Sequence, residues 1–396
     1  MSPWVDDARA ALLTDLYELT MTQAYWREGK LAPATFSLFC RRLPPTRNYL
    51  LAAGLETALH HLETFRFDGE SLSFLASLGS FGTDFLDWLG RARFTGDVRA
   101  VPEGTPVFAE EPLVEVTAPL PEAQLVETFL LNQVHLQTMI ASKAARVVTA
   151  AAGRPVHDFG LRRYHGTDAG VKAARAAWIA GCAGTSNVLA AKVWGLPATG
   201  TMAHSYVQAH EDEAEAFRRF TELYPEATLL VDTYDTLRGV ERVIALSRTR
   251  GAGFRVKAIR LDSGDLGALA REARRMLDAA GLGAVRIFAS GELDEDAVAR
   301  LVAEPIDGFG VGTAMGVSKD APALDVAYKL TSYDGVGRVK LSPGKRSLPG
   351  PKQVFREERG EEAVRDVIAG ADETFPGRPL LVPVMVGGAR TEAGRE

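Results

Sequence analysis

The stretch VKAIRLDSGDLGALAREARRMLDAAGLGAVRIFASG, residues 256–291, contains two short apolar runs separated by a longer segment. Both runs are rich in Val, Ile and Leu, which is typical of buried strands, and apolar side chains recur at helical spacing between them. A strand, a helix and a second strand in this order predict parallel strands joined by a crossover helix. This segment therefore predicts an α/β fold.

The same alternation extends in both directions from this segment. Further strands are expected at 155–159, 197–203, 228–232 and 308–311, beside those at 256–262 and 285–289. Helices are expected at 168–181, 186–194, 209–223, 235–250, 265–280 and 294–303. The number of β-α units favours an irregular TIM-like α/β barrel over one doubly wound sheet. We assign this barrel to residues 121–325.

The flanking regions follow other patterns. Helical spacing over 15–28, 48–64 and 121–152, together with strand patterns over 34–42 and 97–118, predicts a second α+β domain. We assign that domain mainly to residues 1–120, with Thr14 as the N-cap of its first helix. Residues 326–396 predict a β-rich return segment, and we expect its last residues, about fifteen, to be poorly ordered.

Composition excludes several classes of protein. The 396 residues include 45 basic and 51 acidic side chains, so the formal charge of −6 offers no basic face for duplex nucleic acid. Two cysteines form no disulfide framework. The N-terminus lacks the pattern of a signal peptide, and no apolar run approaches the ~20 residues of a membrane span. We expect a cytoplasmic protein with no nucleic-acid and no membrane partner.

In barrels of this kind, chemistry collects where the parallel strands end. That rule selects Asp158, Phe159, Thr201, His204, Asp232, Asp262, Ser290, Gly291, Gly312 and Thr313. The glycines of GFGVGT, residues 308–313, would let backbone N–H groups approach a phosphate, and Thr313 adds a hydroxyl donor. Ser290 and Gly291 would form a second group of donors. The alternative for residues 308–313 is a glycine-rich strand packed tightly against a helix.

Charged and aromatic side chains at the strand ends suggest a ligand. Arg260 and Asp262 share one face of a strand and can hold a carboxylated molecule, although a structural ion pair is the alternative. Phe159 and Arg162 can stack on a flat ring and bind phosphate, or be a core aromatic and a surface cation. His204 is mostly neutral near pH 7 and can act as nucleophile or base, or be a buried structural histidine.

Asp265 and the basic loop 344–352 can each be interpreted in two ways. Asp265 either joins Asp262 at the barrel mouth or lies in the first turn of the next helix, where an acidic residue suits the helix dipole. The basic residues Lys345, Arg346 and Lys352, in the loop 344–352, either cap a bound phosphate or are solvated.

Six segments together resemble the nicotinate phosphoribosyltransferase family. These are LLTDLYELTMTQAY (12–25), DFGLRR (158–163), GTSNVLAAKVWGLPATGTMAHSY (184–206), IRLDSGDL (259–266), GFGVGT (308–313) and LPGPKQVFR (348–356). The resemblance runs, with gaps, from about residue 12 to residue 357. Any one segment is weak evidence, but six in order across a chain of this length are specific.

The resemblance implies an enzyme that joins nicotinic acid to C1 of phosphoribosyl pyrophosphate. The products would be nicotinate mononucleotide and pyrophosphate, in NAD salvage, with ATP hydrolysis coupled through a phosphohistidine. The resemblance also implies a type II phosphoribosyltransferase barrel, Mg²⁺ held largely by substrate phosphates, and a homodimer with shared active sites.

The family's motifs assign roles to matching residues of this chain. They imply Tyr17 and Phe159 for the two faces of the nicotinate ring, Arg260 for its carboxylate, Asp262 for the pyridine and ribose, Thr201 for a substrate contact, Gly312 and Thr313 for phosphate, and His204 for phosphorylation by ATP. Tyr17 would be offered by one subunit to its neighbour.

Three alternatives remain open. Nicotinamide-using relatives place an aspartate near the position of Ser186, and its absence here favours the acid over the amide. Quinolinate carries a second carboxylate and would require more basic residues around the ring than Arg260 and Arg162. A catalytically silent, ligand-binding homologue is the third alternative, and the presence of His204 and Asp262 argues against it.

Overall fold

The computed structural model describes residues 5–342, 347–360 and 362–395, and these form two compact units. The terminal unit comprises the chain up to Met139 and the chain from Ala323, and the central unit runs from Ile140 to Pro322. The helix α6 (Glu127–Ala150) carries the chain from one unit into the other. The sequence-based limits at 120/121 and 325/326 stay predictions. No helix in the described part of the chain has the length and apolarity needed to cross a membrane.

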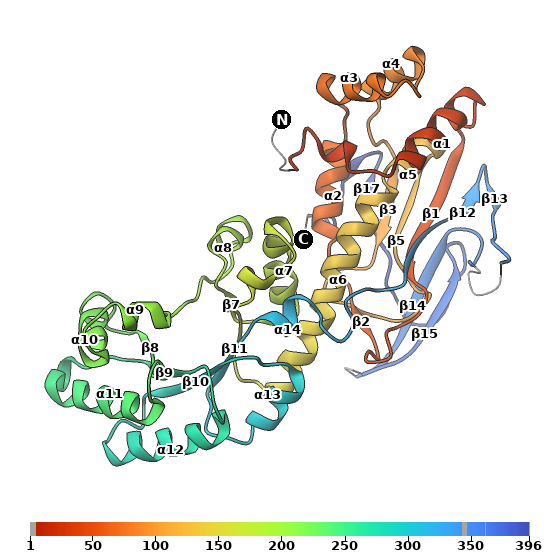
Figure 1. Cartoon of the computed structure of the whole chain (residues 1–396). Coiled ribbons are helices and arrows are strands. Elements are labelled where there is room, and N and C mark those ends of the chain that lie inside the picture. The colour runs from red at the N-terminus through yellow and green to blue at the C-terminus, as the bar shows by residue number, and fades with distance from the viewer. Residues whose placement is uncertain (1–4, 343–346, 361, 396) are drawn as a thin grey trace. The chain divides into compact units, whose positions relative to one another are not determined.

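The central unit is built on a six-stranded parallel sheet (Figure 1). Its strands are β6 (Val156–Asp158), β7 (Gly184–Thr185), β8 (Thr228–Leu230), β9 (Ala258–Leu261), β10 (Arg286–Gly291) and β11 (Gly308–Val311). Their spatial order is β7-β6-β11-β10-β9-β8, so the first strand along the chain pairs with the last. The pairing of β6 with β11 is typical of a barrel. The two edge strands, β7 and β8, do not pair with each other, so the barrel is open between them.

Two strand predictions need correction here. The expected strand at 197–203 is reduced to a single parallel bridge between Ala198 and Thr185. The strand β7 was not predicted, because two residues are too few to show any periodicity. The other five expected strands are present: the strand at 308–311 has the predicted ends, and the ends of the other four differ from the prediction by at most two residues.

Six helices of the central unit lie where the alternating pattern predicts them, and two short helices, His204–Gln208 and Thr313–Gly316, were not predicted. In chain order, the helices are α7 (Thr167–Ile179), α8 (Val188–Trp194), α9 (His204–Gln208), α10 (Glu213–Leu223), α11 (Thr236–Arg250), α12 (Leu266–Ala279), α13 (Glu295–Leu301) and α14 (Thr313–Gly316), with short 3-10 turns at Leu161–Arg163 and Gly251–Gly253. Asp265 is the N-cap of α12 and accepts a hydrogen bond from the Ala268 N–H at 3.0 Å. Asp265 therefore belongs to the start of the next helix, as one of its two interpretations predicted, but as the N-cap and not as a residue of the first turn.

The core of the central unit lies between the sheet and these helices. Leu229, Ile259, Ile287 and Phe309 come from four successive strands and are fully buried in one apolar cluster. Strands covered by crossover helices are buried along their length, which is why their sequences are short apolar runs rather than alternating patterns. The polar strand ends are thereby left at the edge.

The terminal unit contains a seven-stranded antiparallel sheet. In spatial order its strands are β13 (Val336–Gly337), β12 (Val326–Tyr333), β1 (Pro33–Cys40), β5 (Pro112–Pro119), β3 (Asp97–Ala100), β17 (Val382–Val386) and β18 (Ala389–Arg390). Smaller sheets comprise β15 (Glu362–Gly370), β14 (Lys352–Arg359) and β16 (Arg378–Pro379), and β2 (Leu50–Leu51) with β4 (Pro106–Val107). Contrary to expectation, residues 382–395 are part of the folded structure, because β17 pairs with β3 and β18 pairs with β17.

The remaining helices of the terminal unit are α1 (Leu16–Arg27), α2 (Leu55–Thr64), α3 (Gly69–Ser77), α4 (Thr83–Arg91) and α5 (Leu120–Leu125), with a 3-10 turn at Ala10–Leu12. The prediction that Thr14 caps α1 is wrong, since Asp15 occupies the N-cap position. The Thr14 hydroxyl instead donates to the carboxylate of Glu18, at 2.5 Å. The sequence pattern placed the start of α1 within one residue. It could not show whether Thr14 or Asp15 takes the N-cap position, because both residue types can cap a helix.

Candidate active site

The carboxyl ends of the parallel strands gather most of the predicted site residues at one edge of the central unit. Arg260 and Asp262 come from β9 and the residue after it, and Ser290 and Gly291 end β10. Parallel strands begin and end at the same edges, so residues distant in sequence meet there. Tyr17 lies in the terminal unit and is described separately below.

Arg260 is a cation whose side chain is held in place at this edge. Its Nη1 donates to the Thr201 hydroxyl at 2.6 Å, and its Nη2 lies 3.9 Å from Asp262 Oδ1. Burial lowers the pKa of Arg260, whereas the carboxylates of Asp262 and Asp232 oppose that shift. The buried Nε has no hydrogen-bond partner among the described residues. The guanidinium is thus oriented but incompletely paired, which suits a carboxylate ligand.

Asp262 is held by its neighbours on both sides. The Ser290 hydroxyl donates to Asp262 Oδ1, and Ser290 itself is buried. Asp232, after β8, accepts from the Asp262 N–H at 3.0 Å and from the Ser263 hydroxyl at 2.6 Å. The side chain of Asp262 nevertheless remains 34% exposed. Its second oxygen is accordingly available to a ligand, while Ser290 directs its proton to Asp262 and not to the open edge.

His204 faces Asp262 across this edge. His204 opens the short helix α9, and its side chain is 40% exposed. Its Nδ1 lies 3.1 Å from the Thr233 hydroxyl, and its Nε2 lies 3.9 Å from Asp262 Oδ2. The ring is therefore tethered through one nitrogen and presents the other toward a carboxylate, so it is not a buried structural histidine.

Phe159 and the glycine segment of β11 fit together closely. A Cβ added at Gly310 would overlap the Phe159 ring, so glycine at this position makes room for the aromatic side chain. Gly312 precedes α14 and lies against the Phe159 carbonyl, and Thr313 is exposed. Tight packing and an open end are thus both present in this segment: Gly310 serves packing, and Gly312 and Thr313 remain at the edge.

Gly291 and Arg162 complete the predicted set in the central unit. Gly291 has a φ of +115°, and a Cβ there would lie 2.5 Å from the Asp262 carbonyl oxygen, so only glycine fits. Arg162 is exposed on the turn after β6, and its charge contributes to the lowered pKa of Arg260. Two guanidinium groups therefore act on the same edge.

Tyr17 lies in α1 of the terminal unit, and its side chain is exposed. Partial burial raises its pKa, and the negative charge of nearby Glu127 raises it further. The phenol is therefore neutral at any physiological pH. A neutral, exposed aromatic ring suits the stacking role that the family resemblance implies for Tyr17.

The basic loop does not behave as expected. Lys345 and Arg346 lie outside the described residues. Lys352 is buried in the terminal unit, where its Nζ donates to the Gly350 carbonyl at 2.7 Å and lies 3.5 Å from Glu115. Neither a phosphate cap nor a solvated surface group describes Lys352, because its charge is already neutralised inside the protein.

Three residues at or near this edge were not assigned a role in the sequence analysis. Asp232 was selected only by the strand-end rule, and the structure shows that it holds the backbone N–H of Asp262. Thr233, the partner of His204, follows Asp232 directly and could have been found by the same rule. Tyr164 lies beneath the edge, and no sequence signal distinguishes it from an ordinary core aromatic.

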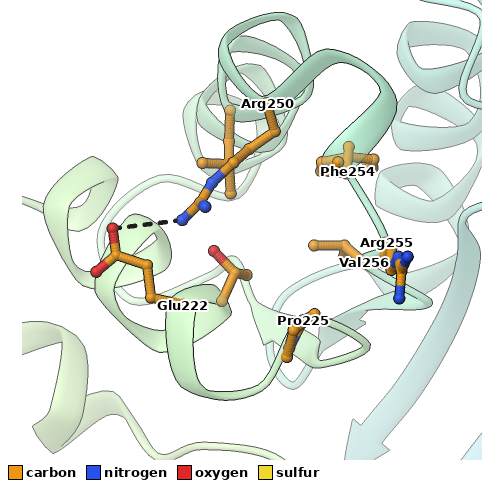
Figure 2. A pocket seen from close by; sticks show the side chains of 9 residues that line it. Glu222, Pro225, Arg250, Phe254, Arg255 and Val256 are labelled. Atoms are coloured by element: carbon orange, nitrogen blue, oxygen red, sulfur yellow. Dashed lines mark ion pairs between the residues drawn. The ribbon is translucent and has the colours of Figure 1, made fainter.

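A separate cleft lies at the opposite, amino-terminal edge of β8 and β9 (Figure 2). It is lined by Thr221, Glu222, Pro225, Leu246, Arg250, Gly253, Phe254, Arg255 and Val256. Arg250 lies 3.5 Å from Glu222, so its charge is paired within the cleft. The polar groups of the strand ends do not reach this edge, and we assign it no part in the chemistry.

Both units match known phosphoribosyltransferases. A family model of the nicotinate phosphoribosyltransferase N-terminal domain matches residues 12–135, and one of the quinolinate phosphoribosyl transferase C-terminal domain matches residues 140–329. The chain is 58% identical over 382 residues to nicotinate phosphoribosyltransferase pncB2 of Mycobacterium tuberculosis, covering 96% of this chain and 82% of that protein. It is 42% identical over 379 residues to the nicotinate phosphoribosyltransferase of Bacillus subtilis, covering 93% and 77%.

Solved structures agree with these matches. Human nicotinic acid phosphoribosyltransferase gives a TM-score of 0.86 at 30% identity, covering 96% of this chain and 90% of that one. Nicotinate-nucleotide pyrophosphorylase from Pyrococcus furiosus gives a TM-score of 0.80 at 26% identity, covering 100% and 96%. The predicted fold, an irregular α/β barrel with a second domain, is confirmed.

Proposed function

The chain belongs to the nicotinate phosphoribosyltransferase family, and we propose that it joins nicotinate to C1 of phosphoribosyl pyrophosphate. The products are nicotinate mononucleotide and pyrophosphate. One observation carries the assignment of the site: Arg260, Asp262 and His204 meet at one edge of the sheet, with each side chain oriented by a neighbouring hydroxyl. An edge of this kind can hold an anionic aromatic ring beside a carboxylate that faces a developing positive charge.

The nicotinate half of the reaction is supported by Arg260 and Phe159. The Thr201 hydroxyl holds the Arg260 guanidinium, which would pair with the single carboxylate of nicotinate. Phe159, packed on Gly310, offers an aromatic face to the pyridine ring, and we propose Tyr17 of a second subunit for the opposite face. The ring nitrogen is thereby aimed at the sugar.

The sugar half of the reaction requires stabilisation of two opposite charges. Breaking the bond to pyrophosphate develops positive charge at C1, which the carboxylate of Asp262 would stabilise. The N–H groups at Gly291 and Gly312 and the Thr313 hydroxyl are proposed donors for phosphate oxygens. Ser290 acts through Asp262, to which its hydroxyl is bound.

Mg²⁺ is a proposed cofactor. The described residues include no cluster of three or more His, Cys, Asp or Glu side chains suited to a metal ion. Asp262 and Asp232 do fit a shared role, because Asp262 is part-exposed and Asp232 Oδ1 has no hydrogen-bond partner among the described residues. These two carboxylates would hold Mg²⁺ together with substrate phosphates. When bound, the ion would neutralise charge on the leaving pyrophosphate.

ATP coupling through phosphorylated His204 is a further part of the proposal. Thr233 tethers the imidazole through Nδ1, and the exposed ring is open to a phosphoryl donor. A phosphate on His204 would add negative charge beside Asp262. This added negative charge would weaken the affinity of the site for pyrophosphate, which offers a means for ATP turnover to drive product release.

A product assay tests the function. The protein is incubated with phosphoribosyl pyrophosphate, Mg²⁺ and nicotinate, nicotinamide or quinolinate, with and without ATP, and the mononucleotide is measured. We expect turnover with nicotinate, stimulation by ATP and loss of that stimulation in His204→Ala. His210→Ala is the matched control, because His210 follows α9 and its Nδ1 lies 2.8 Å from the Tyr206 carbonyl of that helix, so its hydrogen-bond partner is not a residue of the strand ends. Turnover with only another base, or with none, would overturn the assignment.

The choice of acid over amide can be tested at Ser186. Its backbone N–H donates to the Asp158 carbonyl at 2.9 Å, so its position after β7 is fixed. Ser186→Asp would repel the nicotinate carboxylate and accept from an amide N–H. We expect the ratio of kcat/KM for nicotinate to that for nicotinamide to fall about tenfold or more. An unchanged ratio would contradict a role for this position in base choice.

A homodimer and a cytoplasmic location complete the proposal. The family resemblance supports a dimer in which Tyr17 reaches a neighbour's site, and mixing Tyr17→Ala with Arg260→Gln subunits tests this by recovery of activity. Both cysteines, Cys40 and Cys182, are free and buried, which supports a reducing compartment. Cell fractionation tests the location.

A further inference from the structure

Tyr164 occupies a slot between two segments of the proposed active site. Its ring lies directly against Gly160, in the turn after β6, and against Gly316, at the end of α14. A Cβ at either glycine would overlap the ring atoms. The close approach of an aromatic ring to two backbones fixes the distance between those backbones.

The hydroxyl of Tyr164 is also fixed. It donates to Oδ1 of Asp158, which is fully buried. The same carboxylate accepts from the Gly160 N–H at 3.0 Å and from the Thr185 hydroxyl at 2.7 Å. Burial raises the pKa of Tyr164 well above its ordinary value, and the charge of Asp158 adds to this, so the hydroxyl keeps its proton and remains a donor.

The two segments that meet on Tyr164 carry different parts of the proposed chemistry. Gly160 directly follows Phe159, the proposed platform for the pyridine ring. Gly316 ends the helix that Gly312 and Thr313 begin, and these are proposed phosphate donors. The Gly316 N–H also donates to the Gly312 carbonyl at 3.2 Å, so a shift at Gly316 is passed to Gly312.

We propose that Tyr164 is a positioning residue that sets the spacing between the pyridine platform at Phe159 and the phosphate-binding turn at Gly312 and Thr313. It touches no substrate in this arrangement. The inference rests on the proposed function and adds to it a residue that none of the family motifs quoted above includes. Its physical basis is that a ring seated between two glycines, and bonded at its hydroxyl, allows only one separation of the two segments.

The test uses two variants of Tyr164 and one control in the full-length protein. Tyr164→Phe keeps the ring in its slot and removes only the bond to Asp158, so it should fold. Tyr164→Ala empties the slot. Tyr328→Phe is the matched control, because Tyr328 is buried in the terminal unit and its hydroxyl likewise donates a hydrogen bond, to the Ala123 carbonyl at 2.8 Å.

Steady-state kinetics and ligand-induced thermal shifts are the measurements. We expect the KM for phosphoribosyl pyrophosphate to rise about threefold in Tyr164→Phe and at least about tenfold in Tyr164→Ala, with kcat changed less, because misplaced donors weaken binding. The rise in Tm that phosphoribosyl pyrophosphate produces should shrink in the same order. Tyr328→Phe should lower the Tm of the free protein and leave both ligand readouts unchanged.

A second pair of variants checks the slot itself. Gly316→Ala alone should reproduce the KM increase, because its Cβ displaces the Tyr164 ring. Added to Tyr164→Ala, it should cost little more, since the ring it would strike is gone. Additive losses would overturn the proposal, as would Tyr164 variants that lower Tm but leave KM unchanged. Failure of the wild-type protein to form nicotinate mononucleotide would instead overturn the proposed function.

Discussion

Two arginine–aspartate pairs in this protein have opposite designs. In the terminal unit, Arg356 donates from Nε at 2.9 Å and from Nη2 at 2.5 Å to the two oxygens of Asp366, and both side chains are almost fully buried. In the central unit, Arg260 lies 3.9 Å from Asp262, whose side chain is 34% exposed. We call the Arg356–Asp366 pair closed, because its two side chains hydrogen-bond to each other at two positions. We call the Arg260–Asp262 pair open, because its side chains keep hydrogen-bonding groups that are available to a ligand.

The difference separates structural pairs from pairs that are ready for a ligand. A bidentate, buried pair satisfies both partners and has nothing to offer a substrate. An arginine that is oriented by a threonine, but only loosely paired with its aspartate, can exchange that partner for a carboxylate ligand at small cost. Both pairs contain the same residue types, so the sequence does not distinguish them.

The largest effect is expected from breaking the closed pair. Arg356→Met should lower the free energy of unfolding by about 3–5 kcal/mol, because Asp366 would be left buried beside Glu111, a carboxyl whose pKa is already raised by burial. Chemical denaturation measures this loss. At a temperature where the variant is folded, its KM values should equal those of the wild type, and a selective change in KM would contradict a purely structural role.

Breaking the open pair should affect activity rather than stability. Arg260→Gln is expected to lower kcat/KM for nicotinate by about 100-fold, because a charged partner for the substrate carboxylate is lost. The free energy of unfolding should change by less than about 1 kcal/mol, because Arg260 is only loosely paired with Asp262, at 3.9 Å, and the part-exposed Asp262 would not be left as a buried, unpaired charge. Arg260→Lys keeps the charge but loses the planar guanidinium group, so its kcat/KM for nicotinate should lie between the values of the wild type and of Arg260→Gln. A stability loss as large as that of Arg356→Met would show that the pair is structural after all.

A buried carboxyl group that has no ion pair with a cation among the described residues provides a third case. Glu18 is fully buried in the terminal unit and accepts from the Thr14 and Thr128 hydroxyls. Burial raises its pKa from 4.5 to about 7, with added repulsion from Glu127 and Asp15 and opposition from the two hydroxyl donors. The folded protein therefore keeps this proton at pH values where the unfolded chain has lost it.

The pH dependence of stability follows from that shift. The contribution of the protonated Glu18 is fully present below about pH 4.5 and is lost as the pH rises through about 7. At ~1.4 kcal/mol per unit of pKa, the shift from 4.5 to about 7 corresponds to a loss on the order of 3–4 kcal/mol. In chemical denaturation, the free energy of unfolding of Glu18→Gln should change less with pH across this window than that of the wild type. The exposed control Glu272→Gln should follow the wild type, and identical slopes for all three proteins would refute the assignment.

The smallest effect is expected at Thr201. Thr201→Val removes the hydroxyl that orients Arg260 and should raise the KM for nicotinate about tenfold, the value of one hydrogen bond to a charged group. Thr201→Ser keeps the hydroxyl and should stay within about threefold of the wild type. Equal KM values for both variants would mean that Arg260 is oriented by other groups.

Much of this arrangement could be predicted from local sequence. The apolar runs predicted five of the six parallel strands, and the strand-end rule selected Asp232, Asp262 and Ser290 at one edge. The two-residue period placed Arg260 and Asp262 on one face. The missed features are short or non-local: β7 has two residues, and the pairing of β17 with β3 joins segments far apart in the chain.

The sequence by itself determined the alternation of strands and helices, the family, and the side chains at the strand ends, because these depend on periodicity and order along the chain. Only the tertiary structure decided that Lys352 is neutralised by Glu115, that Arg356 is closed on Asp366 while Arg260 stays open, and that Tyr164 is seated between Gly160 and Gly316. The physical reason is that charge pairing and close packing depend on distances between segments remote in sequence, which no local pattern encodes.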